Sequence, residues 1–419
     1  MSLVINFLTF LLPFSLVFSI FVADLIVVLF SIFLLYLILI KKNYFILKND
    51  FFIFGIFISC YFIFLSFFSK DIFLSLRGSL FFFRFFFFVL LISYLILKKN
   101  NTLVIFFYSF LTIYIFIIID SFIQLYSGNN ILGYEYDGTY LKSFFEDEKI
   151  LGSYLIRTIP IFVGIYFLRK NNLNSKSIFI LIFLILILET IIIFTGERTA
   201  IALMFILNIL IAILAIKYSK KNIIYLSLIL IFFLTIISQN SNLRSNIFDR
   251  TFQQLTFKDK INIFSYEHEA HYVSALKMFN ENKLFGVGPR MFRHECNNPK
   301  YEVIITDYED GCSTHPHHLY IQILSETGLV SFIILITIFL FFSYKVLQII
   351  FKRDKIFDNR TFFLFAIFLN IFPLVPYGNF FNNWISILFF LPFAFIINLE
   401  SKIFYNFTLK LLNKKISNS

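Results

Sequence analysis

The stretch SIFILIFLILILETIIIFTGERTAIALMFILNILIAILAI, residues 177–216, contains two long apolar runs separated by a short polar turn at residues 195–199. A helix needs about 20 residues to cross the hydrocarbon core of a bilayer, and each run approaches that length. Only helices and closed barrels satisfy backbone polar groups in lipid, and these runs are too long for barrel strands. This stretch therefore predicts two transmembrane helices joined by a tight turn.

The composition extends this prediction to the whole chain. Its 419 residues are 59% hydrophobic and 15% charged, whereas a soluble domain carries about 25% charged residues. These values exclude a soluble enzyme, a disordered tail protein and a fibrous repeat. The net charge of +11 is spread over short loops, which argues against nucleic-acid binding. We predict an all-α polytopic membrane protein.

Twelve apolar segments of roughly spanning length occur along the chain. They are residues 4–20, 22–40, 51–68, 72–97, 101–126, 150–168, 177–195, 199–216, 222–238, 318–344, 361–376 and 380–398. Four parts follow: about nine helices in 1–238, a periplasmic loop with short helices in 239–317, about three helices in 318–398, and a basic cytoplasmic tail in 399–419.

Basic residues alternate between the loops and thereby predict the orientation. They are concentrated in loops 41–48, 98–99, 169–176, 217–221 and 345–360 and in the tail 402–415. Cytoplasmic loops carry an excess of Lys and Arg, so we expect both termini in the cytoplasm. The first segment has no basic region before it and no small-residue cleavage site, which favours a retained helix over a signal peptide.

All six histidines lie between residues 268 and 318, in the long loop or at its end. Pro316 suits the first position of a helix, which places His317 and His318 in the first turn. The positive end of a helix disfavours an imidazolium, so a neutral histidine there can act as a general base. A histidine-rich helix start can also merely contact lipid headgroups or bind zinc adventitiously. His268 and His271 do not complete an HExxH motif, so we assign no metal and no cofactor.

The turn Thr195-Gly196-Glu197-Arg198-Thr199 presents an arginine on the same side as the long loop. Arginine suits bidentate contact with phosphate oxygens. It also commonly extends from a helix end to a lipid phosphate, which is a purely structural role. Both interpretations fit Arg198 on its own.

Charged residues inside spans are costly and mark functional hypotheses. Arg77 and Arg84 are seven residues apart, which predicts a shared helix face. Arg77 and Arg157 lie nearer the outer side, where they can hold an anionic lipid head. For the remaining charges we favour pairing with arginines between helices. These are Asp24, Asp120 and Glu189.

Two further features lie in the long loop. The stretch 282–293 contains two glycines and a proline, which predict a turn after a helix, and it lacks the context of a phosphate loop. Cys296 and Cys312 can form a disulfide in an oxidising compartment and close a 17-residue segment beside the histidines. Such a bridge is worth about 3 kcal/mol in the chain-entropy model.

Four stretches together resemble the O-antigen ligase and O-antigen polymerase family of bacterial envelope glycan synthesis. They are TGERTA at 195–200, NKLFGVGPRMF at 282–292, HPHHLYIQILSETGL at 315–329 and FPLVPYGNFFNNW at 372–384. His317 and Gly328 match the family's spacing of a histidine and a glycine. His318 stands where the family usually has asparagine.

The resemblance implies a type C glycosyltransferase-like membrane fold, a location in the inner membrane and metal-independent catalysis. Such enzymes transfer a glycan from undecaprenyl diphosphate, either to lipid A–core (ligases) or to another lipid-linked repeat (polymerases). It implies that His317 deprotonates the acceptor and that Arg198 stabilises the leaving diphosphate. For a second diphosphate ligand we rank Arg250 first and then Arg290 and Arg293.

Other residues and functions stay open. His268 occupies the position of a family arginine, and His315 and His318 either act or only surround His317. No residue separates ligase from polymerase, and we lean narrowly to ligase. A transporter of lipid-linked glycans is a third reading, but transporters place their charges near the midplane, whereas here the polar chemistry is concentrated in one outer loop.

Overall fold

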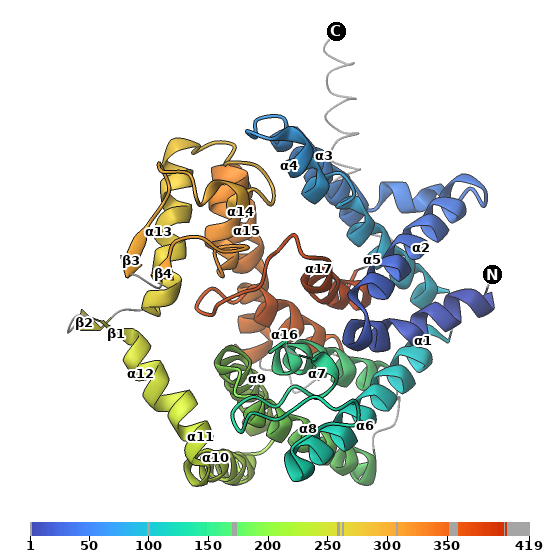
Figure 1. Ribbon diagram of the computed structural model, residues 1–419. Helices are drawn as coiled ribbons and strands as arrows, with labels where there is room; N and C mark the ends of the chain where they lie inside the picture. Colours follow the sequence, from blue (N-terminus) through green and yellow to red (C-terminus); the bar gives the residue numbers. More distant parts are fainter. Residues whose placement is uncertain are drawn as a thin grey trace.

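The computed structural model describes residues 2–98, 101–146, 148–169, 174–257, 260–261, 264–306, 309–351, 359–397 and 399. Within them the regular structure is helical, apart from two short strand pairs in the long loop (Figure 1). The prediction of a helical polytopic protein is confirmed. Apart from Leu399, the predicted tail 399–419 lies outside the described residues, as do Lys99, Lys170 and positions 352–358.

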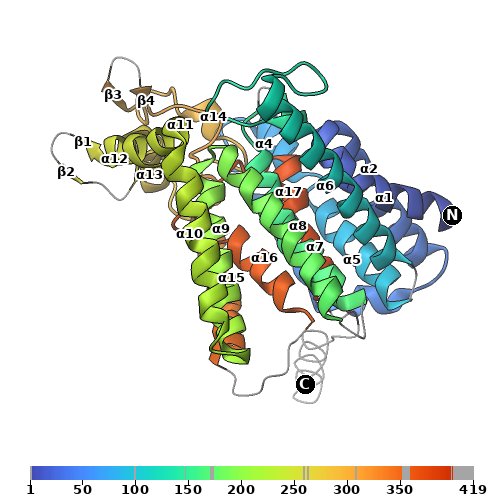
Figure 2. The same cartoon turned by 90° about the horizontal axis from the view of Figure 1, so that it is seen from below.

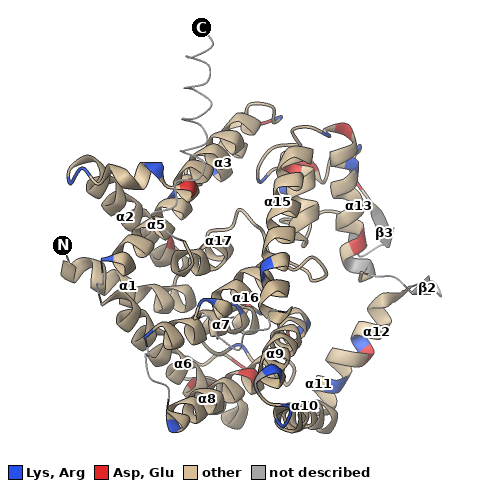
Figure 3. Cartoon of the chain, turned by 180° about the vertical axis from the view of Figure 1, so that it is seen from behind, with Lys and Arg blue, Asp and Glu red and all other residues tan. Residues whose placement is uncertain are grey.

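Every predicted apolar segment contains a helix. In chain order these helices are α1 (Ser2–Phe18), α2 (Ile20–Leu39), α3 (Asp50–Ser66), α4 (Ile72–Ser79), α5 (Phe83–Leu97), α6 (Thr102–Ser127), α7 (Leu151–Arg169), α8 (Ser175–Phe194), α9 (Arg198–Tyr218), α10 (Asn222–Gln239), α15 (Leu319–Phe351), α16 (Thr361–Asn370) and α17 (Asn383–Phe390). Figure 3 shows that these helices carry few charged residues along their length.

Eight helices of the described chain are long and apolar enough to cross a membrane, with α4 and α5 counted as one span. Four more apolar helices are shorter: α1, α3, α16 and α17 with the 3₁₀ turn Leu391–Phe395 that follows it. The chain is a multi-pass membrane protein. These lengths do not establish the predicted count of twelve spans.

Helix α7 lies at the centre of the bundle, where it packs against α6, α8, α9 and α16. Its glycine Gly164 permits this packing, because a Cβ there would lie 2.6 Å from the ring of Phe363 in α16. Lipid supplies no hydrophobic force between helices, so close van der Waals contact of this kind holds the bundle together. Gly164 thus leaves the space that the ring of Phe363 occupies.

Three of the predictions about intramembrane charges fail and one is confirmed. Residues 80–82 separate α4 from α5, so Arg77 and Arg84 do not share a helix face. Arg84 Nε donates to Asp24 Oδ1 at 2.9 Å, which is the predicted interhelical pair. Asp120 instead accepts from the Ser143 hydroxyl at 2.6 Å and from the backbone N–H of Ile131 at 2.9 Å.

The carboxylate of Asp120 therefore anchors the acidic loop that follows α6, and it needs no arginine. The prediction of an arginine partner is also wrong for Glu189, which hydrogen-bonds to the side chain of Asn208 instead. In both cases a neutral polar group close to the carboxyl takes the place of a charged one.

The long loop forms a layer of short elements at one end of the bundle (Figure 2). They are α11 (Ser241–Arg244), a π-helical turn (Ser245–Asp249), α12 (Arg250–Leu255), β1 (Thr256–Phe257), β2 (Lys260–Ile261), α13 (Tyr266–Glu281), α14 (Phe292–Glu295), β3 (Ile304–Thr306) and β4 (Glu309–Asp310). Both strand pairs are antiparallel. Met278, Met291 and Phe292 belong to a small apolar core of this layer, separate from that of the bundle. Helix α13 packs along α15 and so joins the two.

Candidate functional site

His317 lies in the loop just before α15 and not in its first turn. The helix begins at Leu319, and His317 has a left-handed backbone with φ of +56°. The prediction of a position at the positive helix end is therefore wrong for this residue. His318 takes the capping role instead, because its carbonyl accepts from Gln322 N–H at 2.9 Å and its Nδ1 from Ile321 N–H at 3.4 Å.

Three other histidines surround the His317 ring. The ring centroid of His315 lies 4.1 Å away, that of His268 5.3 Å and that of His271 5.4 Å. His268 and His271 come from one face of α13, three residues apart. His268 was a candidate from the sequence and His271 was not, although a spacing of three residues places both on one face of a helix.

Burial and mutual repulsion keep His317, His268 and His315 neutral. Burial, followed by His268 and His271, lowers the pKa of His317 to about 4. Burial also lowers the pKa of His268 to about 4 and that of His315 to about 3. A histidine with such a pKa is neutral at pH 7 and can accept a proton. The expected neutral base is thus present for a different reason from the helix end.

The stretch 372–384 holds the histidine segment from the other side. The backbone N–H of Tyr377 donates to the carbonyl oxygen of His317 at 2.9 Å. His318 Nε2 lies 3.0 Å from the carbonyl oxygen of Pro373, and Gln322 Nε2 donates to Asn379 Oδ1 at 2.8 Å. These bonds join residues about 55 to 60 positions apart and fix the start of α15.

The glycine-rich stretch 282–292 packs against the backbone of α15. Val287 N–H donates to the Ser325 carbonyl and Leu329 N–H to the Lys283 carbonyl, both at 2.9 Å. A Cβ on Gly328 would lie 2.1 Å from the Leu284 carbonyl oxygen, and Gly328 has a left-handed φ of +76° at the kink inside α15. The glycines of both stretches therefore serve close backbone packing, as expected where only glycine fits.

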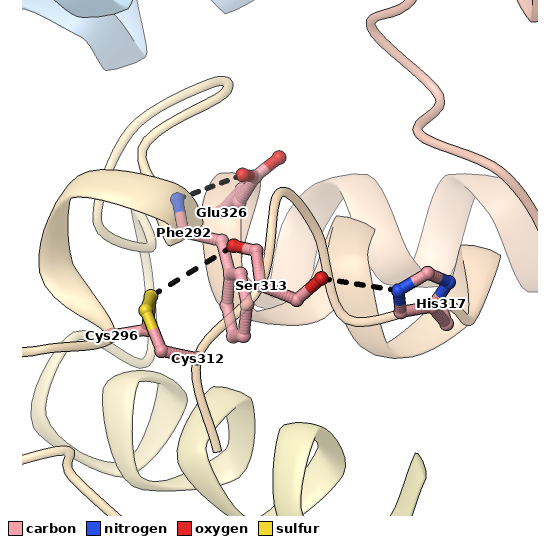
Figure 4. The surroundings of a disulfide bond; sticks show 6 residues. All are labelled: Phe292, Cys296, Cys312, Ser313, His317 and Glu326. Atoms are coloured by element: carbon pink, nitrogen blue, oxygen red, sulfur yellow. Dashed lines mark hydrogen bonds between the residues drawn. A yellow bond between two sulfur atoms is a disulfide. The ribbon is translucent and has the colours of Figure 1, made fainter. Parts of the chain in front are cut away.

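A disulfide closes the loop beside the histidines. It joins Cys296 to Cys312, with their Cα atoms 4.9 Å apart, and Cys296 Sγ lies 3.9 Å from the carbonyl oxygen of Ser313 (Figure 4). The hydroxyl of Ser313 is 3.2 Å from Nε2 of His317. Ser313 therefore connects the bridge to the imidazole, and this contact was not expected from the sequence.

Arg198 is the first residue of α9 and approaches the histidines from the opposite part of the bundle. Its Nη1 donates to the Thr251 hydroxyl at 3.2 Å, and its charge helps to lower the pKa of His268. The neighbouring Glu197 carboxylate accepts from the backbone N–H of Gly152 and of Ser153 at the start of α7. A carboxylate is stabilised at a helix N-terminus, so Glu197 fixes the turn that presents Arg198.

Burial raises the pKa of this Glu197 carboxyl to about 7, although the two backbone hydrogen bonds oppose the shift. Glu197 thus titrates close to neutral pH, unlike His317. Neither Glu197 nor Thr251 was among the residues expected from the sequence.

The other candidate arginines fall into three places. Arg250 is exposed and donates to the Tyr140 hydroxyl at 3.1 Å. Arg157 is buried in α7, with its guanidinium 5.3 Å from the ring centre of Tyr377. Arg290 packs against Gly78 in α4, the helix that carries Arg77, and Arg293 follows in α14.

Within the described residues, no group of three or more His, Cys, Asp or Glu is arranged to hold a metal ion. Of the four stretches that are distant in sequence, 372–384 bonds directly to His317, and 282–292 packs against α15 at Ser325 and Leu329. In the stretch 195–200, the charge of Arg198 acts on His268.

Residues 179–336 match the family model described as O-antigen ligase. Over these residues the chain is similar to the O-antigen ligase family. The resemblance found in the sequence is thereby confirmed for this segment, which includes Arg198, the long loop and His317. No curated protein sequence matches the chain. The matched segment does not include Tyr377, which bonds to His317, or Arg157, which contacts the Tyr377 ring.

Proposed function

We propose that the protein transfers a glycan from undecaprenyl diphosphate to lipid A–core in lipopolysaccharide synthesis. The site would face the periplasm and both termini the cytoplasm of a bacterial inner membrane, with the loop 239–317 between bundles 1–238 and 318–398. The O-antigen ligase family domain supports the class of reaction. The basic loops at the other end of the bundle support the orientation.

In the proposed reaction, the acceptor hydroxyl attacks the anomeric carbon of the donor sugar. His317 takes the proton of that hydroxyl, a new glycosidic bond forms, and the bond from the anomeric carbon to the diphosphate oxygen breaks. The electron pair leaves with undecaprenyl diphosphate, and Arg198 stabilises the added negative charge. Positive charge at the leaving group thus comes from an arginine side chain.

The single observation that carries this proposal is the neutral His317, enclosed by three histidines, with Arg198 beside that cluster. A general base is most effective when its pKa is near the working pH, and a pKa of about 4 makes a weak base. Binding of the donor raises the pKa of His317 toward the working pH, because a bound diphosphate brings negative charge that favours the imidazolium. The base therefore becomes stronger when the substrate is present.

The test is to replace His317 in the native host and to separate the surface polysaccharide on a gel. His317→Asn is the informative variant, because asparagine tolerates the left-handed backbone and lacks a base. His317→Ala is run beside it, and immunoblotting confirms that both proteins are inserted. We expect lipid-linked glycan to accumulate while lipid A–core stays bare.

Two other results are informative. Core that carries single repeats without long chains would assign the protein as the polymerase, which joins lipid-linked repeats by the same chemistry. A full ladder in both variants would show that His317 is not the base. A transporter would give no turnover of a lipid-linked donor by purified protein.

A further inference from the structure

Three arginines form a second basic group on the far side of the histidines. Arg77 comes from the last turn of α4, and Arg290 and Arg293 come from the end of the stretch 282–292 and from α14. Burial, followed by the charges of Arg293 and Arg77, lowers the pKa of Arg290, and Arg290 packs against Gly78, the neighbour of Arg77. Like charges gathered in one place repel one another, so the fold must hold them there.

Backbone packing is what holds Arg290 in this group. Arg290 has a left-handed backbone with φ of +64°, which is unfavourable for a residue with a side chain. The Ser75 hydroxyl donates to the Pro289 carbonyl at 3.2 Å, and a Cβ on Gly78 would lie 3.0 Å from Cβ of Arg290. This strained backbone places Arg290 directly against the helix that carries Arg77.

The acidic residues nearby do not pair with these side chains. Glu326 lies close enough to offset part of the charge, but Oε1 accepts from Phe292 N–H at 2.9 Å and Oε2 from Gln322 Nε2 at 3.0 Å. Glu295 is 3.8 Å from Lys70. Nε of Arg293 is buried without a hydrogen-bond partner in the described part of the chain. The three arginines therefore leave uncompensated positive charge, which suits an anionic ligand.

This basic group and Arg198 lie on different sides of the candidate base. Arg198 affects the pKa of His268, whereas Arg293 affects that of His315, and both rings adjoin His317. Helices α4 and α9, which carry Arg77 and Arg198, are well apart (Figures 1 and 2). In a single displacement, the attacking oxygen and the leaving oxygen are in line on opposite faces of the anomeric carbon. If Arg198 holds the leaving diphosphate, the second group faces the acceptor.

An apolar cavity is lined by residues of α3 and α15 and by Phe82, which follows Arg77 by five residues. Its volume is about 700 Å³, and Phe62, Phe82, Ile323, Leu335 and Phe380 are among its lining residues. Phe62 is one helical turn from Ser66, whose hydroxyl is 2.7 Å from that of Ser79 at the end of α4. The lining extends along α15 to Lys345, a rise of roughly 30 Å at 1.5 Å per residue. A hydrocarbon chain fits this length of bilayer.

We propose that Arg77, Arg290 and Arg293 bind a phosphate group of the acceptor, and that the cavity beside them receives the acceptor's hydrocarbon chain. This inference rests on the proposed function, in which Arg198 serves the donor. The ligand class is a phosphorylated glycolipid. Lipid A–core and a polyprenyl-diphosphate-linked repeat share this chemistry, and the experiment distinguishes them.

The experiment measures transfer by the purified full-length protein in lipid nanodiscs. Arg77→Ala is the main variant because Arg77 is exposed, and Arg77→Lys tests rescue by charge. Arg244→Ala removes the same charge from an exposed position of the loop layer and serves as the matched control. Initial rates are measured against each substrate in turn, with phosphorylated and dephosphorylated lipid A–core and with a lipid-linked repeat as acceptors.

We expect Arg77→Ala to raise the KM for the phosphorylated acceptor about tenfold, as for loss of a charge-assisted hydrogen bond. The KM for the donor should change less than twofold, Arg77→Lys should recover part of the loss, and Arg244→Ala should match the wild type. With dephosphorylated acceptor the wild type and Arg77→Ala should be equal. The acceptor whose KM responds identifies the source of the phosphate.

A rise in the KM for the donor, or an equal loss with phosphorylated and dephosphorylated acceptors, would overturn the inference. So would an unchanged Arg77→Ala variant. If the wild type transfers glycan in these cases, the proposed function stands and only the acceptor site is wrong. If the wild type transfers nothing from any lipid-linked donor, the proposed function fails.

Discussion

The backbone N–H of Tyr377 is bonded to the carbonyl oxygen of His317, 60 residues earlier in the chain, at 2.9 Å. The ring of the same tyrosine lies 5.3 Å from the guanidinium of Arg157 in the central helix α7. One residue between α16 and α17 therefore joins the candidate base to the core of the bundle. This contact gives the left-handed backbone of His317 a fixed partner, and it favours a rigid site over a mobile loop.

Replacing Arg198 tests the leaving-group role. Arg198→Ala should lower kcat by about 10²–10³-fold, the usual cost of losing one group that stabilises transition-state charge. Arg198→Lys should keep part of the activity, since it retains the charge but loses the bidentate fork. Thr251→Ala removes only the hydroxyl that contacts Arg198 and should cost less than tenfold. Rates come from donor turnover, and equal kcat for Arg198→Ala and the wild type would contradict the assignment.

The pH dependence tests the base. His317 must be neutral to accept a proton, and its pKa of about 4 lies below its usual value. The ratio kcat/KM should therefore stay constant from pH 8 to about 5 and fall tenfold per unit below the pKa. The profile of kcat should fall at higher pH than that of kcat/KM, because the bound diphosphate raises the pKa of the imidazole.

Glu197 provides the control for this profile. With a pKa of about 7 it can add an inflection near neutral pH. Glu197→Gln should remove such an inflection and leave the acid limb of His317 unchanged. If kcat/KM falls with a midpoint near pH 6.5, and this fall persists in Glu197→Gln, His317 is not held in the buried cluster described above.

The disulfide should stabilise the loop layer but not the bundle. Replacing Cys296 and Cys312 by serine should destabilise that layer by about 3 kcal/mol in the chain-entropy model and lower activity. Limited proteolysis should then cut within 239–317 while the helices stay protected. Cys60→Ser is the matched control, since Cys60 is free and exposed in α3. A reductant should reproduce this effect in the wild type. It should have no further effect on the double variant, which lacks the disulfide.

Gly328 should tolerate no side chain. Its φ is +76°, and a Cβ would lie 2.1 Å from the Leu284 carbonyl oxygen, so Gly328→Ala should abolish insertion or activity. Gly133→Ala offers a comparison with φ of +90° and no atom within 4 Å. It should cost only about 1 kcal/mol of backbone strain. Equal thermal stability of the two variants in detergent would contradict the close packing.

The sequence predicts the helices well, because a long apolar run has few alternatives in lipid. It also predicts that Asp24 pairs with an arginine, as it does with Arg84, since buried charges need partners. It fails where the outcome depends on local backbone. The seven-residue spacing of Arg77 and Arg84 presumes a continuous helix, which residues 80–82 interrupt. Asp120 finds neutral donors in a loop whose path the sequence does not reveal.

The candidate site shows the same division. His317 and Arg198 stand out by residue type and by family spacing, and the structure places both beside the histidine cluster. The position of His317 differs because Pro316 does not begin the helix, and His317 turns left-handed to meet Tyr377. Ser313, Thr251 and Tyr377 contribute through contacts between residues that are 4 to 60 positions apart in the sequence. No periodic pattern predicts such contacts.

The interlocking of three distant stretches also limits how such a protein can be cut or exchanged. The family match ends at residue 336, yet Pro373, Tyr377 and Asn379 hold the backbone and side chains around His317. A chimera that joins the matched segment of one relative to the C-terminal helices of another would separate partners that fit only each other. A chimera that keeps this site should therefore take both segments, 282–329 and 372–384, from the same relative.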